Sequence, residues 1–335
     1  MTTAGGFALA ELAVVLAASP LLLDALGDRR GMLAALGAMC LVAAGQFVVR
    51  GALIGTGRMG IYGGVLVLDG VLRVVLAVAV ALAVSTDSVG YAWTLVAAIA
   101  ISHVPLLFVV LRRAVGHPGE PVGARSFAAS VVPLLAGSLA AQLLLNGVPV
   151  LVSAVAAADE QVAAGRFQAA FLLARIPLFV AVPLQTVILP ALTRLFESDR
   201  AAVALRVVSR FAGAMLGMAV LGVAAAYSIG PWLIELVFGA QYVVERFDLA
   251  AMVVGVAAYL GLIFVTQALV ASALHAKVAW SWLVGLAVAV LVFAAVGDLV
   301  LRAELAFLLG STVGCVVGLA QLLAAHRRKS SRARN

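Results

Sequence analysis

Arginine and glutamine side chains lie inside an apolar stretch long enough to cross a membrane, over residues 162–192. Gln168 precedes Arg175 by seven residues, which places both side chains on one face of a helix. An arginine near the middle of a membrane helix costs roughly 2.5 to 3.5 kcal/mol, so such residues usually face a protein interior or a wet cavity. We therefore expect Arg175 to line a cavity, and Arg166, half a turn out of phase, to reach toward lipid headgroups.

A guanidinium in such a cavity is suited to binding anions, because its paired N–H donors match the oxygens of a phosphate. Three prolines that would free backbone carbonyls follow this arginine: Pro177, Pro183 and Pro190. Gln142 and Asn146 stand four apart in the preceding span, and a short turn brings that span back toward Arg175. The alternative for these amides is interhelical hydrogen bonding, worth roughly 0.6 to 2 kcal/mol in membranes.

Three further charged residues lie within apolar spans. Asp69 and Arg73 stand four apart on one helical face and can pair, which lowers the cost of both charges. Either this is a structural ion pair or it takes part in ion or proton coupling. Glu11 is a third coupling candidate, and the alternative is that it hydrogen-bonds a neighbour.

Other kinds of chemistry have little support in the sequence. Cys40 and Cys315 both fall inside predicted spans, where they serve as small apolar residues. The four histidines have no carboxylate or cysteine at ligand spacing, so we expect no metal site. His103 is most simply a satisfied interior histidine, with a proton-carrying role as the alternative. No hydrolase triad, phosphate loop or large loop with paired carboxylates is present, so we expect neither an enzyme nor a cofactor.

Composition places all these residues in an all-α polytopic membrane protein. Hydrophobic residues make up 65% of the 335 residues and charged residues 11%, with a mean hydropathy of +1.18. About ten apolar segments approach the 20 residues that a membrane helix needs. They lie at 5–23, 31–49, 60–84, 91–111, 127–155, 162–192, 211–234, 248–274, 278–297 and 305–325.

Basic residues gather in alternate loops, and this predicts the orientation. One set contains Arg50, Arg58, Arg112, Arg113, Arg125, Arg194, Arg200, Arg206, Arg210, Lys277, Arg327, Arg328, Lys329, Arg332 and Arg334. The other contains Arg29, Arg30, Arg246 and Arg302. We therefore expect a cytoplasmic-membrane protein with both termini in the cytoplasm. The net charge of +7 then reflects insertion and contact with anionic lipids rather than nucleic-acid binding.

A weak internal repeat suggests how the spans are organised. The segment VRGALIGTG at 49–57 resembles VTQALVASA at 265–273, and PLLLDAL at 20–26 resembles PWLIELV at 231–237. These matches pair span two with eight and span one with seven, so the repeat is six helices and its copies share one orientation. We expect two pseudo-symmetric lobes in an incomplete six-plus-six arrangement, with the first two helices missing.

The two expected lobes divide the chain into four segments. They are a four-helix lobe at 1–115, a cytoplasmic linker at 116–126, a six-helix lobe at 127–326 and a basic tail at 327–335. The linker assignment rests on its glycine, proline and arginine content.

The order of four segments resembles the multidrug/oligosaccharidyl-lipid/polysaccharide (MOP) flippase superfamily, and within it the polysaccharide exporters of the Wzx type. These segments are a basic linker, QLLLNGVPVLVSAVA, GRFQAAFLLARIPLFVAVPLQTVILPALTRL and LIELVFGAQY. The resemblance implies two six-helix lobes and alternating access. In related lipid II flippases the eighth helix supplies a cavity arginine. The repeat makes the sixth span here that helix, so the resemblance implies Arg175 or Arg166 as its match.

The function expected from these observations is flipping of a polyprenyl-diphosphate-linked oligosaccharide across the cytoplasmic membrane. Its cavity candidates are Arg175, Arg166, Gln168, Gln142 and Asn146. A polysaccharide polymerase or glycosyltransferases would be further partners. Two alternatives remain: a proton-coupled drug exporter, which would need acidic cavity walls, and a truncated or structural member that acts as an assembly partner, which the missing helices favour.

Overall fold

The computed structural model describes residues 2–20, 23, 29–83, 88–116, 124–179, 189, 192–194 and 201–332, and every regular element within them is a helix. The contacts of the chain divide it into two compact units, Met1–Pro121 and Val122–Asn335, called here the N-terminal and C-terminal units. The sequence predicted an all-α polytopic membrane protein, and the helices confirm that class.

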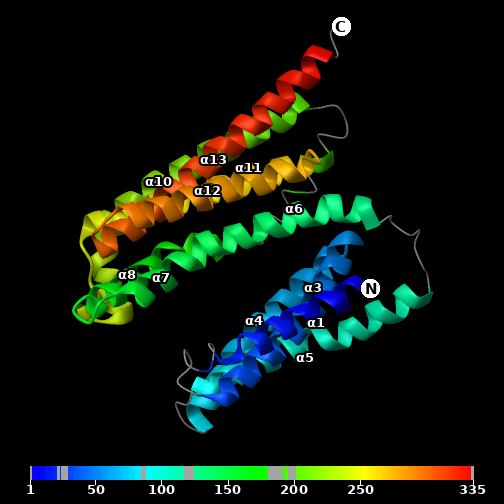
Figure 1. The fold of residues 1–335 in the computed structure, drawn as a ribbon, viewed down its shortest axis with the longest axis horizontal. Helices are drawn as coiled ribbons and strands as arrows, with labels where there is room; N and C mark the ends of the chain where they lie inside the picture. The colour runs from blue at the N-terminus through cyan, green and yellow to red at the C-terminus, as the bar shows by residue number, and fades with distance from the viewer. Residues whose placement is uncertain are drawn as a thin grey trace. The chain divides into compact units, whose positions relative to one another are not determined.

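The N-terminal unit is a bundle of apolar helices (Figure 1). In chain order these are α1 (Thr2–Ala17), α3 (Arg30–Gly55), α4 (Met59–Ala83) and α5 (Ser88–Gly116). Helix α5 packs along both α3 and α4, and α1 packs against α3. The valines of α4 at 67, 71, 74 and 78 are at least half exposed, as befits a face turned to lipid.

The C-terminal unit contains the remaining elements (Figure 1). They are α6 (Ala124–Gln142), η1 (Leu143–Gly147), α7 (Val148–Val155), α8 (Gln161–Ala174), α10 (Ala201–Phe238), η2 (Ala240–Tyr242), α11 (Arg246–Ala271), α12 (His275–Ala295) and α13 (Leu299–Arg332). Helix α13 packs along both α11 and α12, while α10 lies against α11 and α6 against α12.

Eight helices in the described part of the chain are long and apolar enough to cross a membrane. They correspond to the predicted spans other than 5–23 and 162–192, each of which extends into residues outside the description. Helix α3 continues to Gly55, six residues past the predicted end of its span. Arg50, which we had placed in a loop, therefore lies inside a membrane helix.

The two units contain a matching pair of helices, as the repeat predicted. Helices α3 and α11 both have 26 residues, and each boundary of α11 lies 216 positions after that of α3. Two residues past each helix the backbone adopts positive φ, 68° at Gly57 and 56° at Ala273. At both ends that residue and the next donate N–H bonds back into the last helical turn, which is the Schellman motif. Part of the other repeated segment, at 20–26, lies outside the described residues.

Helices α12 and α13 approach each other through glycines. A side-chain carbon added at Gly285 would lie 2.7 Å from the Gly310 carbonyl oxygen and 3.4 Å from the Gly314 Cα atom. Glycine is required here because backbone atoms of the neighbouring helix occupy the space. We call this contact the glycine seam.

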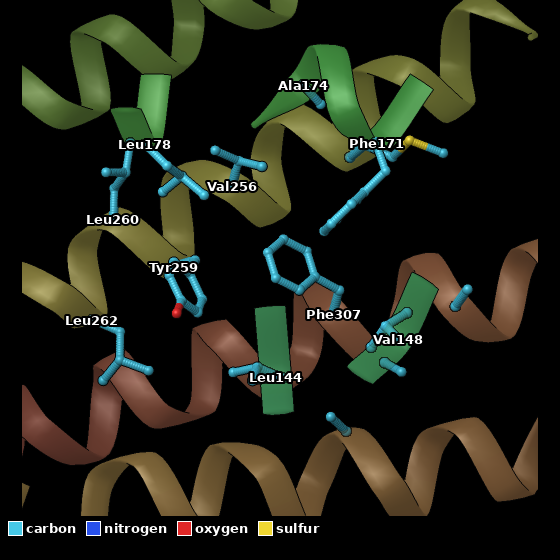
Figure 2. Packing of buried hydrophobic residues seen from close by; sticks show 14 of the residues in the cluster. Leu144, Val148, Phe171, Ala174, Leu178, Val256, Tyr259, Leu260, Leu262 and Phe307 are labelled. Carbon is cyan, nitrogen blue, oxygen red and sulfur yellow. The ribbon is translucent and has the colours of Figure 1, made fainter. Parts of the chain in front are cut away.

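An aromatic cluster lies within the core of the C-terminal unit, and Figure 2 labels three of its members, Phe171, Tyr259 and Phe307. The Phe171 ring of α8 meets Phe307 of α13 edge-on, with ring centroids 5.0 Å apart. Phe307 in turn stacks on Tyr259 of α11 at 5.7 Å, and Tyr259 lies 5.2 Å from Trp282 of α12. Phe171 and Phe307 are each only 2% exposed. This packing fixes the position of α8 and hence of the arginine at its end.

Candidate functional site

Arg175 lies where α8 ends. Ala174 is the last helical residue, and Arg175 follows with φ −84° and ψ 1°. The sequence had predicted one continuous helical span to residue 192; the structure interrupts the helix at Arg175, residues 176–179 are helical again, and most of the remaining span lies outside the described residues. Pro177 has no N–H to bond the Leu173 carbonyl, and its ring clashes with that carbonyl, so the helix breaks before it. Pro183 and Pro190 lie outside the described residues.

The C-terminal end of α8 is a favourable place for a positive charge, because the helix dipole is negative there. Arg175 Nη1 donates a long hydrogen bond of 3.4 Å to Asn146 Oδ1, and its Nε is buried without a partner among the described residues. The two salt bridges found among those residues both lie in the N-terminal unit. No described carboxylate therefore neutralises Arg175.

A cavity of about 490 Å³ opens beside this arginine. Its polar lining includes Arg175, Gln168, Gln161 and Ser153, and its aromatic lining includes Phe171 and Tyr242. Gln168 Nε2 donates to Ser153 Oγ, which joins α8 to α7 across the cavity wall. We call this space the polar cavity. Since Arg175 is the only charged residue that lines it among those described, the polar cavity is suited to an anion.

Asn146 links the polar cavity to a second one. It lies in η1, a π-helical turn directly before α7, where Pro149 cannot donate to the Leu145 carbonyl. Asn146 Nδ2 donates to Gln142 Oε1 at 2.8 Å, while its Oδ1 accepts from Arg175. Gln142 lines a different cavity, of about 310 Å³, between α6, α11 and α12. Arg175, Asn146 and Gln142 thus form one chain of polar contacts, and their roles in binding remain a prediction.

Arg166 has a different environment. Its Nε donates to the Gln241 carbonyl oxygen at 2.9 Å, which joins α8 to η2. It lines a separate cavity of about 420 Å³ that also contains Glu245 and Asp248. The structure therefore gives Arg166 a short bond to a backbone carbonyl and acidic neighbours, whereas Arg175 has only the long bond to Asn146 and no acidic residue in its cavity among those described.

Two arginines of the N-terminal unit form a network around Asp69. Its carboxylate accepts bonds from Arg73 at 3.0 and 3.1 Å, as the spacing predicted, and from Arg50 at 3.2 Å. Arg50 Nε also donates to His103 Nε2 at 3.2 Å, and its other nitrogens face the side-chain amide of Gln46. Asp69, Gln46 and His103 are all buried. Two guanidinium groups therefore share one carboxylate. Glu11 is exposed on α1.

Sequence reasoning missed Arg50, Gln46 and His103 as members of this network. A signal was present, because Gln46 and Arg50 stand four apart on one face of α3. With the span ended at 49, that face could not be recognised. At the offset of 216 positions that relates α3 to α11, Gly285 of the glycine seam corresponds to Asp69. Asp69 accepts a hydrogen bond from Arg50 of α3, whereas Gly285 packs against Gly310 of α13, so the two matching positions contact different neighbouring helices.

Comparisons with known proteins identify the fold. No protein-family model matches the chain, and no curated protein sequence does. Among solved structures, the Vibrio cholerae MATE transporter VcmN matches with a TM-score of 0.73 and 14% identity, over 97% of this chain and 77% of that one. Another MATE crystal structure matches at 0.71 and 14%, over 100% and 78%.

An outward-facing multidrug resistance MATE family transporter of the MOP superfamily matches at 0.64 and 14%, over 99% of this chain and 79% of that one. At this identity the likeness concerns the fold rather than the substrate. The chain is a multi-pass membrane protein with the fold of the MATE transporters, which belong to the MOP superfamily that the sequence pattern resembles.

Proposed function

We propose that this protein is a flippase that moves a polyprenyl-diphosphate-linked oligosaccharide across the cytoplasmic membrane by alternating access. The observation that carries the proposal is the unneutralised Arg175 in the polar cavity. A diphosphate cannot cross hydrocarbon with its charge exposed, and a guanidinium in a wet cavity can offset that charge through paired hydrogen bonds. The transporter fold and the Wzx-type sequence pattern support the same assignment.

The amides around Arg175 suit the sugar part of such a ligand. Gln168, Gln161 and Ser153 offer both donors and acceptors along one cavity wall. The unpartnered Nε of Arg175 is one donor that a phosphate oxygen would satisfy. We therefore assign the diphosphate to Arg175 and the first sugar to the Gln168 side.

Replacing Arg175 tests the proposal. A hydrogen bond to a charged group is worth roughly 1.5 to 3 kcal/mol, so Arg175→Ala should slow export of lipid-linked glycan at least about tenfold at unchanged protein level. Arg175→Lys should recover only part of the activity, because lysine keeps the charge but loses the fork geometry. Normal export by correctly inserted Arg175→Ala would refute the assignment.

Arg166 provides the matched control on the same helix. Because its Nε bonds a backbone carbonyl of η2, Arg166→Ala should lower stability and leave export per inserted molecule near the wild-type rate. Equal loss of export from both variants would mean that α8 needs its arginines for folding rather than for the ligand.

A drug exporter is the second candidate, because one matching structure is a multidrug resistance MATE transporter. Exporters of cationic drugs need acidic walls, whereas the charged residue lining the polar cavity in the described part of the chain is Arg175. Efflux of a cationic dye separates the two functions: a flippase should leave dye accumulation unchanged. Dye efflux that survives Arg175→Ala and depends on a membrane proton gradient would favour the exporter.

A further inference from the structure

We infer that a groove between α8, α10 and α11 holds the hydrocarbon chain of the anionic ligand whose phosphate is bound at Arg175. This inference rests on the proposed function and adds a second subsite to it. The groove has a volume of about 260 Å³ and only apolar lining residues, among them Ala174, Pro177, Ala219, Ala225, Val253 and Val256. We call it the apolar groove.

The apolar groove has a buried floor and an open mouth. Val256 and Leu249, on the floor, are 1% and 2% exposed, whereas Ile176 and Ile229, at the mouth, are both 52% exposed. The groove is therefore open along one side to the surroundings of the unit. In a membrane protein, an opening lined only by apolar side chains admits hydrocarbon and excludes charged groups.

Glycine and alanine residues on α10 make the groove possible. At Gly230 an added side-chain carbon would collide with Leu249, and at Gly222 it would lie 3.0 Å from Val253. These glycines let α10 approach α11 closely and so form the floor. The alanines Ala219 and Ala225 leave the space above it unfilled.

The apolar groove adjoins the polar cavity through α8. Leu173, Ala174, Ile176 and Pro177 line the groove, and Arg175, in the middle of this run, lines the polar cavity. The two spaces therefore lie on different faces of the same helix end, with the backbone at the end of α8 between them. A ligand with its phosphate at Arg175 therefore needs to pass its chain around only one turn of backbone to reach the groove.

The charge of Arg175 determines which hydrocarbon chain occupies the groove. Lipid tails are as apolar as leucine, so an apolar groove gains nothing by taking a ligand tail in place of a bulk lipid tail. Phosphate binding at Arg175 favours the ligand's own hydrocarbon tail over bulk lipid tails, because it holds that tail next to the groove at high effective concentration. The predicted occupant is thus the first part of the chain of a lipid phosphate or diphosphate.

The size of the groove limits how much of the chain it holds. At about 30 Å³ for each water-sized group, 260 Å³ accommodates roughly eight or nine such groups. This corresponds to about two isoprene units. The remainder of a long polyprenyl chain would extend through the open mouth into the bilayer.

Photolabelling in phosphatidylcholine nanodiscs tests the inference. The probes are a geranylgeranyl phosphate with a diazirine in its second isoprene unit and the corresponding uncharged alcohol. The phosphate should label residues 173–177 and 218–233 at least about tenfold more than the alcohol, because one charged hydrogen bond supplies that factor. Arg175→Ala should reduce labelling by the phosphate to the level of the alcohol.

Two neighbouring alanines of α10 provide a matched pair for filling the groove. Both are exposed, but Ala225 lines the groove and Ala224 does not. Ala225→Phe should fill the space and remove the labelling of 218–233, and Ala224→Phe should leave it unchanged. Folding of both variants is checked by their thermal unfolding.

The labelling pattern decides the inference. Equal labelling by the phosphate and the alcohol, or labelling that persists in Arg175→Ala, would show that bulk hydrocarbon fills the groove and would overturn the inference. Labelling as expected without glycan transport would retain the groove and refute the flippase function. Transport that depends on Arg175, with the label outside the groove, would retain the function and refute the groove.

Discussion

Removing the carboxylate of Asp69 should destabilise the protein strongly, and removing Arg73 as well should restore part of the loss. Asp69 has a side chain only 7% exposed, whereas Arg50 and Arg73 are 23% and 40% exposed. Breaking a buried ion pair by removing one partner costs about 3 to 5 kcal/mol, because a charge is left uncompensated. Asp69→Ala leaves two uncompensated charges, on Arg50 and Arg73.

The two arginines would then repel each other. Their Nη2 atoms bond the same carboxylate oxygen at 3.2 and 3.0 Å, so these nitrogens are no more than about 6 Å apart. Two unit charges at that distance repel by about 3 kcal/mol at an effective dielectric constant of 20. Arg73→Ala alone leaves a neutral pair of Arg50 and Asp69, and should change the free energy of unfolding by less than about 1 kcal/mol.

The clearest test of this prediction is the sign of the energetic coupling between Asp69→Ala and Arg73→Ala. The double variant Asp69→Ala/Arg73→Ala should be more stable than Asp69→Ala, by up to about 3 kcal/mol. The measurement is unfolding of the purified protein by sodium dodecyl sulfate in mixed micelles, with exposed Asp159→Ala as the control. A double variant less stable than Asp69→Ala would refute the reasoning, as would an Asp69→Ala variant as stable as the control.

Three shorter predictions concern the seam, the orientation and the core. Gly285→Ala should cost about 1 to 3 kcal/mol in the same unfolding assay, because a carbonyl oxygen of α13 occupies the space, whereas Gly217→Ala, with nothing within 4 Å, should cost nothing. In a background without native cysteines, a cysteine at Arg113 should be protected from an impermeant thiol reagent in intact cells, and one at Gln161 should react; the reverse pattern would invert the orientation. Tyr259→Phe should cost about 1 kcal/mol, since the hydroxyl donates to a carbonyl of α6 at 3.0 Å, and an unchanged unfolding midpoint would contradict this.

The helical class and the repeat could be predicted because both depend on local sequence. Hydropathy over about 20 residues identifies a membrane helix without knowledge of its neighbours. The match between 49–57 and 265–273 reflects a shared helix end, since Gly57 and Ala273 both adopt the positive φ that closes the Schellman motif. The pairing of Asp69 with Arg73 follows from a spacing of four on one helix.

The contacts across helices could not be predicted in this way. Arg50 reaches Asp69 over 19 positions in the sequence and His103 over 53, and no helical period links them. Helical phase separated Arg166 from Arg175 in the sequence, but the bond from Arg166 to the Gln241 carbonyl, 75 positions away, is visible only in the structure. Pro177 was visible in the sequence, but whether it kinks a helix or ends it depends on whether neighbouring groups satisfy the freed carbonyl.

The glycine seam determines which parts of the C-terminal unit can move. Backbone atoms of α12 and α13 touch at Gly285 and Gly310, and contacts between backbones have no side-chain rotamers through which to readjust. These two helices must therefore move together as one rigid body. Any change in the shape of the polar cavity then has to come from the elements that line it, which are α7, α8 with the break after it, the end of α10, and η2. In the N-terminal unit, Asp69 at the position matching Gly285 joins α4 to α3 through a hydrogen bond from Arg50, and such a side-chain contact, unlike a contact between backbones, can exchange partners.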